Sequence, residues 1–297
     1  MEKRSTGIWY DVLAVTIVAF WGLTFISTMK LLRYYHPSQI FLMRFSIAYA
    51  GMWFFSHDRL FAGSLRDEAT LALGGIMGGS LYFWAENTAL AVSHQASCIS
   101  FIVCTTPLVT ALLAIALRHK DSRMTLPLAV GSIIAIAGIA MVMLSGRVFE
   151  GIPLSGYLLA VVASLTWAVY TIAVGDMADK YSSAFVSRKV FFYGLVTIIP
   201  VLFIEGNPFD LGALRIPEVY GNLLFLSVVA SLGCYALWTP VIKRLGPIRA
   251  SNYIYLNPVF TLVGAFFILG ERMTWLSLLG SAVTLLGVWL AGRRSLS

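Results

Sequence analysis

Residues 246–287 read GPIRASNYIYLNPVFTLVGAFFILGERMTWLSLLGSAVTLLG, and this stretch decides the fold. A long apolar run with Pro258 at its middle ends at the charged turn Gly270-Glu271-Arg272, and a second apolar run follows. The same pattern occurs near residues 95–138. The matched pairs are Ser100 with Ser251, Pro107 with Pro258, Thr110 with Thr261, Ala114 with Ala265, Gly131-Ser132 with Gly280-Ser281, and Gly138 with Gly287. Such a repeat indicates a chain built from two copies of one unit.

The composition is that of a membrane protein. Hydrophobic residues make up 59% of the 297 residues and charged residues only 12%, against about half and about a quarter in average proteins. A membrane-spanning helix needs ~20 apolar residues. We therefore predict an all-α integral membrane protein with ten transmembrane helices, at Tyr10–Leu32, Pro37–Ser56, Ala69–Val92, Gln95–Leu117, Thr125–Leu144, Leu154–Gly175, Ala184–Glu205, Val219–Ile242, Pro247–Leu269 and Thr274–Ala291.

The basic residues predict the orientation of the chain. With a cytoplasmic N-terminus, fifteen Lys and Arg residues fall in cytoplasmic segments and five in outer segments, while Arg44 lies inside a span. This distribution follows the positive-inside rule. Because the net charge of +7 is divided among alternate loops, it does not indicate nucleic-acid binding. We expect a multi-pass protein of the cytoplasmic (inner) membrane with both termini in the cytoplasm, and a first run too long for a cleaved signal peptide.

The repeat extends to the first two spans of each half. Trp21 matches Trp167, Arg44 matches Arg188, and Tyr82 and Tyr235 are the best pair in the more weakly aligned third spans. Five spans are an odd number, so the second copy enters the membrane from the opposite side. We predict two inverted five-helix repeats, residues 1–146 and 147–297. In transporters built this way, the substrate site lies near the membrane midplane between the repeats.

This layout resembles the EamA family of the drug/metabolite transporter superfamily. The resemblance rests on the two five-helix halves, on a tryptophan in the first span of each, and on Leu269-Gly270-Glu271-Arg272 before a last span with spaced glycines. The first half departs from the Gly-Glu turn, with Arg118-His119-Lys120-Asp121 in its place. The resemblance implies transport of small metabolites, including outward movement of amino acids.

Two prolines are the first candidates for a functional role. Pro107 and Pro258 each remove one backbone hydrogen bond inside a span, and in lipid the freed carbonyl must find another partner. Thr105, Thr106 and Asn257 stand beside the prolines and could supply one. The prolines are either hinges that open the backbone towards a cavity or simple packed kinks.

Aromatic side chains form the second group of candidates. Trp21 and Trp167 lie near mid-depth in their spans, away from the interfacial region where tryptophan is usually enriched. They either line a cavity, where ring faces bind apolar groups and cations, or pack helices together. The residues that we predict to bind substrate are Trp21, Thr24, Tyr82, Ser100, Thr106, Trp167, Tyr170, Tyr235, Trp238, Asn252, Tyr255 and Asn257.

Charged side chains inside the spans form the third group. Glu86 is the one carboxylate well inside a span, where an unpaired charge costs at least ~2.5–3.5 kcal/mol. We expect an ion pair between Glu86 and either Lys30 or Arg44, with proton coupling through Glu86 as the functional alternative. Arg44 and Arg188 either recognise a substrate carboxylate or act as latches that bind loop carbonyls.

The remaining signals narrow the class of protein. Spaced glycines in the third, fifth and tenth spans predict close helix packing, and Cys98, Cys104 and Cys234 are expected to be free thiols. We expect no metal, no cofactor and no nucleotide site. The leading hypothesis is a secondary transporter for a small-molecule substrate, working as a monomer or weak dimer. A receptor or scaffold without transport is the alternative, and an intramembrane enzyme is disfavoured because no catalytic set is present.

Overall fold

The structure is a computed structural model that describes residues 2–57, 59–117, 125–144, 153–269 and 274–291. Regular structure in this part of the chain is entirely helical. The predicted turns at Gly270-Glu271-Arg272 and Arg118-His119-Lys120-Asp121 lie outside the described residues. The principal helices are α1 (Glu2–Leu31), α2 (Pro37–Phe55), α3 (Leu65–Gly75), α4 (Tyr82–Ser93), α5 (Ala96–Val103), α6 (Thr106–Ala116), α7 (Leu126–Leu144), α8 (Leu154–Ala178), α9 (Ser183–Glu205), α10 (Pro217–Leu224), α11 (Cys234–Leu245), α12 (Pro247–Asn252), α13 (Asn257–Gly264) and α14 (Trp275–Ala291).

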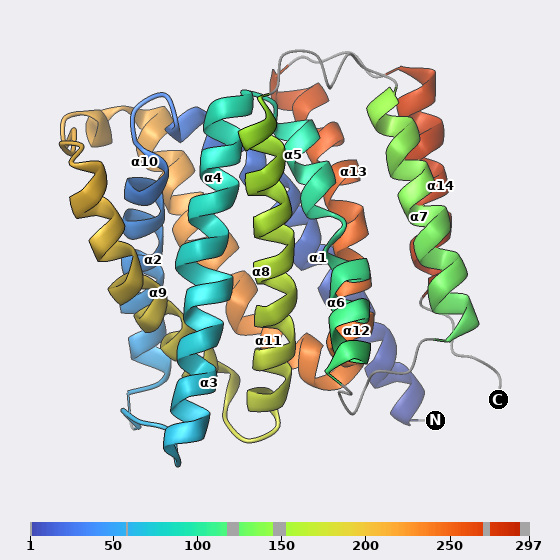
Figure 1. The fold of residues 1–297 in the computed structure, drawn as a ribbon, viewed down its shortest axis with the longest axis horizontal. Helices are drawn as coiled ribbons and strands as arrows, with labels where there is room; N and C mark the ends of the chain where they lie inside the picture. The colour runs from blue at the N-terminus through green and yellow to red at the C-terminus, as the bar shows by residue number, and fades with distance from the viewer. Residues whose placement is uncertain (1, 58, 118–124, 145–152, 270–273, 292–297) are drawn as a thin grey trace.

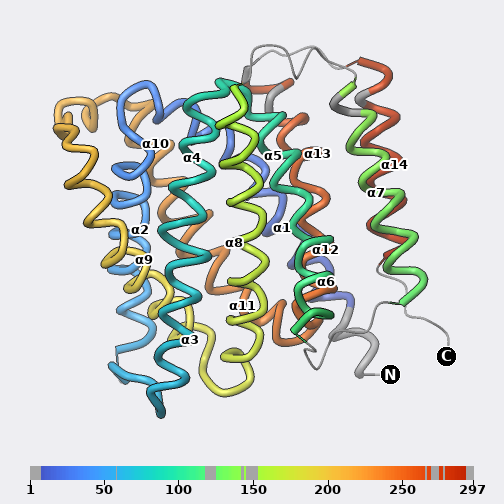
Figure 2. The backbone as a smooth tube through the Cα atoms, in the orientation of Figure 1, coloured from blue at the N-terminus to red at the C-terminus, as the bar shows by residue number. Residues whose placement is uncertain are grey.

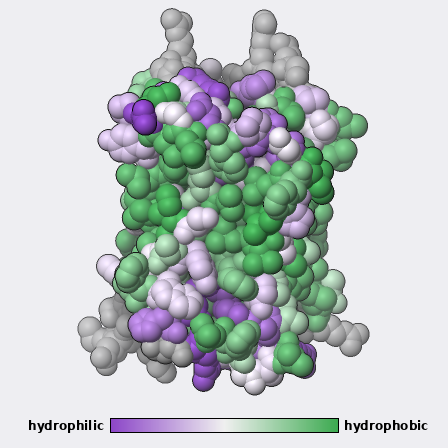
Figure 3. Space-filling model, turned by 90° about the vertical axis from the view of Figure 1, so that its left-hand side faces the viewer, coloured by the Kyte–Doolittle hydropathy of each residue, from purple (hydrophilic) through white to green (hydrophobic). Residues whose placement is uncertain are grey.

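The helices stand side by side as one bundle. α1 begins and α14 ends at the same end of the molecule, the lower end in Figure 1. The backbone trace shows α8 running downwards, opposite to α1 (Figure 2). Six of the helical segments are long and apolar enough to cross a membrane. One face of the bundle shows a broad hydrophobic band between hydrophilic ends (Figure 3), as expected for side chains in contact with lipid.

Two long helical segments are interrupted at matching places. The chain turns at Cys104 and Thr105 between α5 and α6, and a short 3₁₀ turn, Tyr253–Leu256, separates α12 from α13. Each interruption lies just before a proline, Pro107 or Pro258. Because proline carries no N–H, the helical hydrogen bond to the residue four positions earlier cannot form there.

Two other segments contain π-helical turns that the sequence did not reveal. Ile76–Leu81 joins α3 to α4, and Phe225–Gly233 joins α10 to α11. Both contain small residues, and each ends one or two residues before a tyrosine, Tyr82 or Tyr235. π-helical turns free backbone carbonyls and often occur at functional sites.

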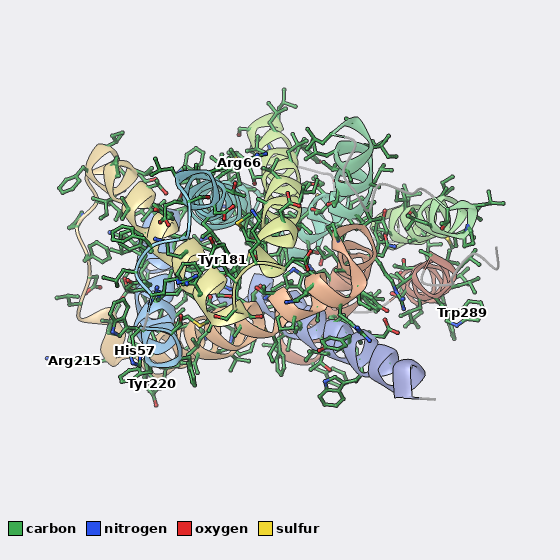
Figure 4. The ribbon with its side chains drawn as sticks, turned by 90° about the horizontal axis from the view of Figure 1, so that it is seen from below. His57, Arg66, Tyr181, Arg215, Tyr220 and Trp289 are labelled. Atoms are coloured by element: carbon green, nitrogen blue, oxygen red, sulfur yellow. The ribbon has the colours of Figure 1, made fainter. Side chains whose placement is uncertain are left out.

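Close helix packing at the spaced glycines is confirmed. α7 and α14 lie against each other and stand at the side of the bundle (Figure 4). A Cβ added to Gly138 would lie 2.4 Å from the backbone nitrogen of Thr284, and one added to Gly131 would lie 2.4 Å from that of Ala291. The two backbones therefore approach as closely as glycine permits.

Ion pairs gather at the lower end of the bundle. Lys180 Nζ lies 2.6 Å from Asp67 Oδ1, and the Tyr181 hydroxyl donates to the other Asp67 oxygen at 2.9 Å. Tyr181, labelled in Figure 4, stands in the connection between α8 and α9. Lys189 pairs with Glu68 in the same region. These contacts join the start of α3 to the α8–α9 turn.

Arg188 binds loop carbonyls. This is one of the two roles that the sequence analysis proposed for Arg44 and Arg188. The Arg188 guanidinium donates to the backbone carbonyls of Ser56 and Arg59, just after the end of α2. Its side chain also lies over the ring of Trp53 at 5.1 Å. Arg188 is therefore a contact between α9 and the α2–α3 connection.

Candidate functional site

The candidate site is a buried cavity at the centre of the bundle. Its empty volume is about 390 Å³, including space that is open to solvent. Both interrupted segments contribute residues to it, and the π-helical turns Ile76–Leu81 and Phe225–Gly233 lie beside the lining residues Tyr82 and Tyr235. The lining residues are Trp21, Thr24, Phe25, Arg44, Tyr82, Phe83, Glu86, Val103, Thr106, Trp167, Tyr235, Ile254 and Asn257.

Aromatic rings in edge and tilted contacts form much of the wall. The Trp21 and Trp167 rings lie 5.2 Å apart at 86°, and Tyr82 packs on Trp167 at 4.7 Å. Tyr235 contacts both tryptophans, with centroid distances of 6.0 and 5.8 Å. Such contacts fix large apolar side chains in defined orientations.

The carbonyls beside the π-helical turns orient two of these rings. The Tyr235 hydroxyl donates to the Gly78 carbonyl at 2.9 Å, and Trp21 Nε1 donates to the Ala230 carbonyl at 3.0 Å. Gly78 lies in the π-helical turn Ile76–Leu81 and Ala230 in the π-helical turn Phe225–Gly233. Each turn therefore supplies an acceptor that holds an aromatic residue contributed by another segment.

Two opposite charges line the same cavity. Glu86 is 6% exposed and Arg44 is 3% exposed, and the Arg44 guanidinium is close enough to act electrostatically on the Glu86 carboxyl. The Arg44 side chain also donates to the Ser231 hydroxyl and lies 4.5 Å from the Phe83 ring centre. The cavity thus presents a carboxyl group and a guanidinium among aromatic rings.

We predicted that Glu86 forms an ion pair with either Lys30 or Arg44. The pairing with Lys30 is wrong. Lys30 Nζ lies 2.9 Å from Glu218 Oε1 at the start of α10. The long lysine side chain can reach the end of the bundle, where both charges remain partly exposed to solvent. Arg44 lines the same cavity as Glu86, but the ion pairs found among the described residues do not include one between these two side chains.

Two polar groups in the cavity have no hydrogen-bond partner among the described residues. These are the Asn257 side-chain oxygen and Trp167 Nε1. Asn257 is 4% exposed and Trp167 is 4% exposed. One group accepts and the other donates, so a bound ligand with both functions would satisfy them.

The interrupted segments also present backbone to the cavity. The carbonyl of Val103, which Pro107 leaves without its helical donor, accepts from the Thr106 hydroxyl at 2.6 Å. Thr106 in turn lies 3.2 Å from the Ser164 hydroxyl of α8. The sequence-based expectation that Thr106 replaces the lost donor is confirmed.

Not every predicted residue reaches the cavity. Seven of the predicted substrate-binding residues line it, together with Arg44 and Glu86. Tyr170 and Trp238 pack behind the wall, at 4.8 Å from Trp167 and 4.9 Å from Trp21. Buried elsewhere in the bundle are Ser100, Asn252 and Tyr255, and Ser100 donates to the Ser97 carbonyl.

Four lining residues escaped the sequence analysis. Phe25, Phe83, Val103 and Ile254 are apolar side chains in apolar helices, so nothing in their type distinguishes them from packing residues. Their positions in the sequence could have identified them. Each lies within three residues of a predicted lining residue, and Val103 and Ile254 are the residues whose carbonyls the prolines set free.

The bundle and its polar, aromatic cavity define a multi-pass membrane protein of the transporter class. The chain belongs to the EamA-like transporter family, whose model matches residues 8–144 and again residues 154–293. The resemblance drawn from the sequence is thereby confirmed.

The similar proteins carry transporter names. An uncharacterized transporter of Archaeoglobus fulgidus is 26% identical, over 94% of this chain and 95% of its own. A probable terminal-alkyne amino-acid exporter of Streptantibioticus cattleyicolor is 27% identical, over 99% and 96%. A probable amino-acid metabolite efflux pump of Salmonella typhimurium is 24% identical, over 94% and 93%. A solved crystal structure with 16% identity shares the fold, with a TM-score of 0.71 over 97% of this chain and 96% of the other.

Proposed function

We propose that this protein is a secondary transporter that exports amino acids or closely related zwitterions through the central cavity. The observation that carries the proposal is the presence of Arg44 and Glu86 in one aromatic cavity. A guanidinium suits a substrate carboxylate, and a carboxylate suits a substrate ammonium. The names of the relatives support the same class of cargo.

The remaining groups of the cavity fit the rest of such a substrate. Trp21, Trp167 and Tyr82 offer ring faces and edges to an apolar or aromatic side chain. The free donor of Trp167 and the free acceptor of Asn257 complement the carboxylate and the ammonium. The present space is narrow, so the walls must move apart when cargo enters.

Alternating access supplies that movement in the proposal. Residues 1–146 and 147–297 act as two inverted five-helix repeats that rock about the cavity. The interruptions before Pro107 and Pro258 serve as hinges, since the backbone there already lacks a helical hydrogen bond. The protein works in the inner membrane with both termini in the cytoplasm, as a monomer or weak dimer. A substrate gradient or a proton bound at Glu86 drives the cycle.

Counterflow in proteoliposomes tests this function. Vesicles loaded with one unlabelled amino acid and diluted into its labelled form should accumulate label faster than protein-free vesicles. A panel of apolar, aromatic, acidic and basic amino acids defines the cargo. The Arg44→Gln variant should lose exchange, whereas Arg66→Gln, at the lower end of α3, should retain it. Binding without exchange would indicate a receptor and contradict the proposal.

A further inference from the structure

The Ile254 carbonyl loses its helical donor at Pro258 and accepts instead from the backbone N–H of Asn257, at the end of the 3₁₀ turn. Proline at position 258 has no N–H to offer to the carbonyl four residues earlier. In a membrane-spanning segment, water is not at hand to replace that donor. The Cys104 thiol is a second donor to the same carbonyl, with Sγ 3.0 Å from the Ile254 oxygen. Cys104 is only 1% exposed.

The two interruptions differ in how their free carbonyls are satisfied. In the first, Thr106 donates to Val103 within its own turn. The residue that matches Thr106 in the second half is Asn257, whose backbone position is the same but whose side-chain oxygen has no partner. Besides the Asn257 N–H, the second interruption therefore relies on a side-chain donor from the first, the Cys104 thiol.

This dependence joins both turns to the cavity. Cys104 stands in the turn between α5 and α6, flanked by Val103 and Thr106 on either side of the interruption. Ile254 lies in the 3₁₀ turn, and Asn257 begins the next helix. Val103, Thr106, Ile254 and Asn257 all line the cavity.

We propose that Cys104 is a positioning residue for transport: its hydrogen bond to Ile254 sets the position of Ile254 and Asn257 in the substrate cavity. This inference rests on the proposed transport through that cavity. The thiol does not touch the substrate. It fixes the turn that presents the Asn257 acceptor, and it does so from the opposite half of the chain.

The other two cysteines do not share this geometry. All three are free and buried, but of the described hydrogen bonds only that of Cys104 joins the two interruptions. Cys98 lies in α5, six residues before Cys104, and is 0% exposed. Replacing Cys98 by alanine thus reproduces the loss of a buried sulfur without the loss of this hydrogen bond.

The test compares Cys104→Ala, Cys104→Ser and Cys98→Ala in the counterflow assay. Removing the donor in Cys104→Ala should raise the substrate KM about fivefold or more relative to Cys98→Ala, with a smaller change in kcat. Cys104→Ser keeps a donor of similar reach and should stay within about twofold of the unmodified protein. Equal KM values in Cys104→Ala and Cys98→Ala would overturn the proposal. So would an equal rise in the alanine and serine variants, because sulfur packing would then explain it.

A second readout separates this inference from the proposed function. Hydrogen–deuterium exchange in peptides covering residues 250–262 should be faster in Cys104→Ala than in Cys98→Ala, with Cys104→Ser restoring the slow rate. This result is expected even if no amino acid is transported. If the hydrogen–deuterium exchange rate of these peptides is the same in Cys104→Ala as in Cys98→Ala, the role of the thiol is contradicted, whatever result the transport assay gives.

Discussion

Trp21 and Trp167 hold matching positions in the two halves of the chain, and their rings meet edge to face with centroids 5.2 Å apart. Their indole nitrogens differ. Trp21 Nε1 donates to the Ala230 carbonyl at 3.0 Å, whereas Trp167 Nε1 has no partner among the described residues. One indole is therefore held by a hydrogen bond to the backbone, and the other is held by ring packing alone among the described contacts.

This difference predicts unequal effects of two similar substitutions. Trp21→Phe should destabilise the protein by about 1–3 kcal/mol more than Trp167→Phe, because it leaves the buried Ala230 carbonyl without its donor. Both variants lose similar volume, so the comparison isolates the hydrogen bond. Thermal unfolding of the two purified variants measures it. Equal stabilities, or a lower stability of Trp167→Phe, would be inconsistent with the geometry.

Glu86 is expected to control the pH dependence of transport. Glu86→Gln keeps the shape of the side chain but cannot ionise, so it can neither attract a substrate ammonium nor bind and release a proton. Counterflow at pH 7 should fall at least about tenfold, a loss of about 1.4 kcal/mol in transition-state stabilisation, and should no longer vary with pH. Glu218→Gln, whose carboxylate pairs with Lys30 at the other side of the bundle, is the control. Full transport with an unchanged pH profile in Glu86→Gln would remove its role.

The glycine contact between α7 and α14 predicts a large effect from one methyl group. Gly138→Ala places a Cβ 2.4 Å from the backbone of Thr284, so the helices must separate, at a cost of about 1–3 kcal/mol. Gly221 in α10 has no atom within 4 Å of an added Cβ. Gly221→Ala should be neutral or stabilise by up to about 1 kcal/mol, because alanine favours helix. Similar melting temperatures for the two variants would argue against the close packing.

Asp67 provides a prediction on pH and stability. It lies just before the predicted span Ala69–Val92. The hydrogen bond from Lys180, followed by that from Tyr181, lowers the pKa of the Asp67 carboxyl below its ordinary value of 3.8. A lowered pKa stabilises the folded state above the ordinary value, and this contribution is lost as pH falls towards the folded pKa.

Lys180→Met should therefore melt at a lower temperature than the unmodified protein at pH 7. The difference should shrink as the pH falls below about 4, because the stabilisation from the lowered pKa of Asp67 is lost between its ordinary value of 3.8 and its folded value. Melting curves between pH 7 and pH 3 give the comparison. A difference that stays constant or grows with acidification would contradict the lowered pKa of Asp67.

The sequence predicted the parts of the site that polarity or repetition marks. Trp21 and Trp167 stood out because they lie at mid-depth in their spans, away from the interface. Glu86 and Arg44 stood out because charged residues are unusual inside apolar helices. Their meeting in one cavity depends on helix packing, which no local pattern encodes. Lys30 shows the same limit, since its partner Glu218 lies far away in sequence.

Some of the backbone irregularities could be predicted from the sequence, and others could not. The interruptions at Pro107 and Pro258 were predictable because proline removes a defined hydrogen bond. The π-helical turns at Ile76–Leu81 and Phe225–Gly233 were not, since they contain no proline or other residue that marks such a turn in the sequence. The cysteine that donates to the Ile254 carbonyl was expected to act only as a small apolar side chain.

Cysteine labelling inside the cavity tests the central claim most directly. Thr24 lines the cavity, whereas Phe20, one turn earlier in α1, is 37% exposed on the surface. The amino acid that drives counterflow should slow thiol labelling of Thr24→Cys, with half of the effect at its transport KM, and should leave labelling of Phe20→Cys unchanged. If saturating substrate leaves both labelling rates the same as without it, the cargo does not occupy this cavity and the account is wrong.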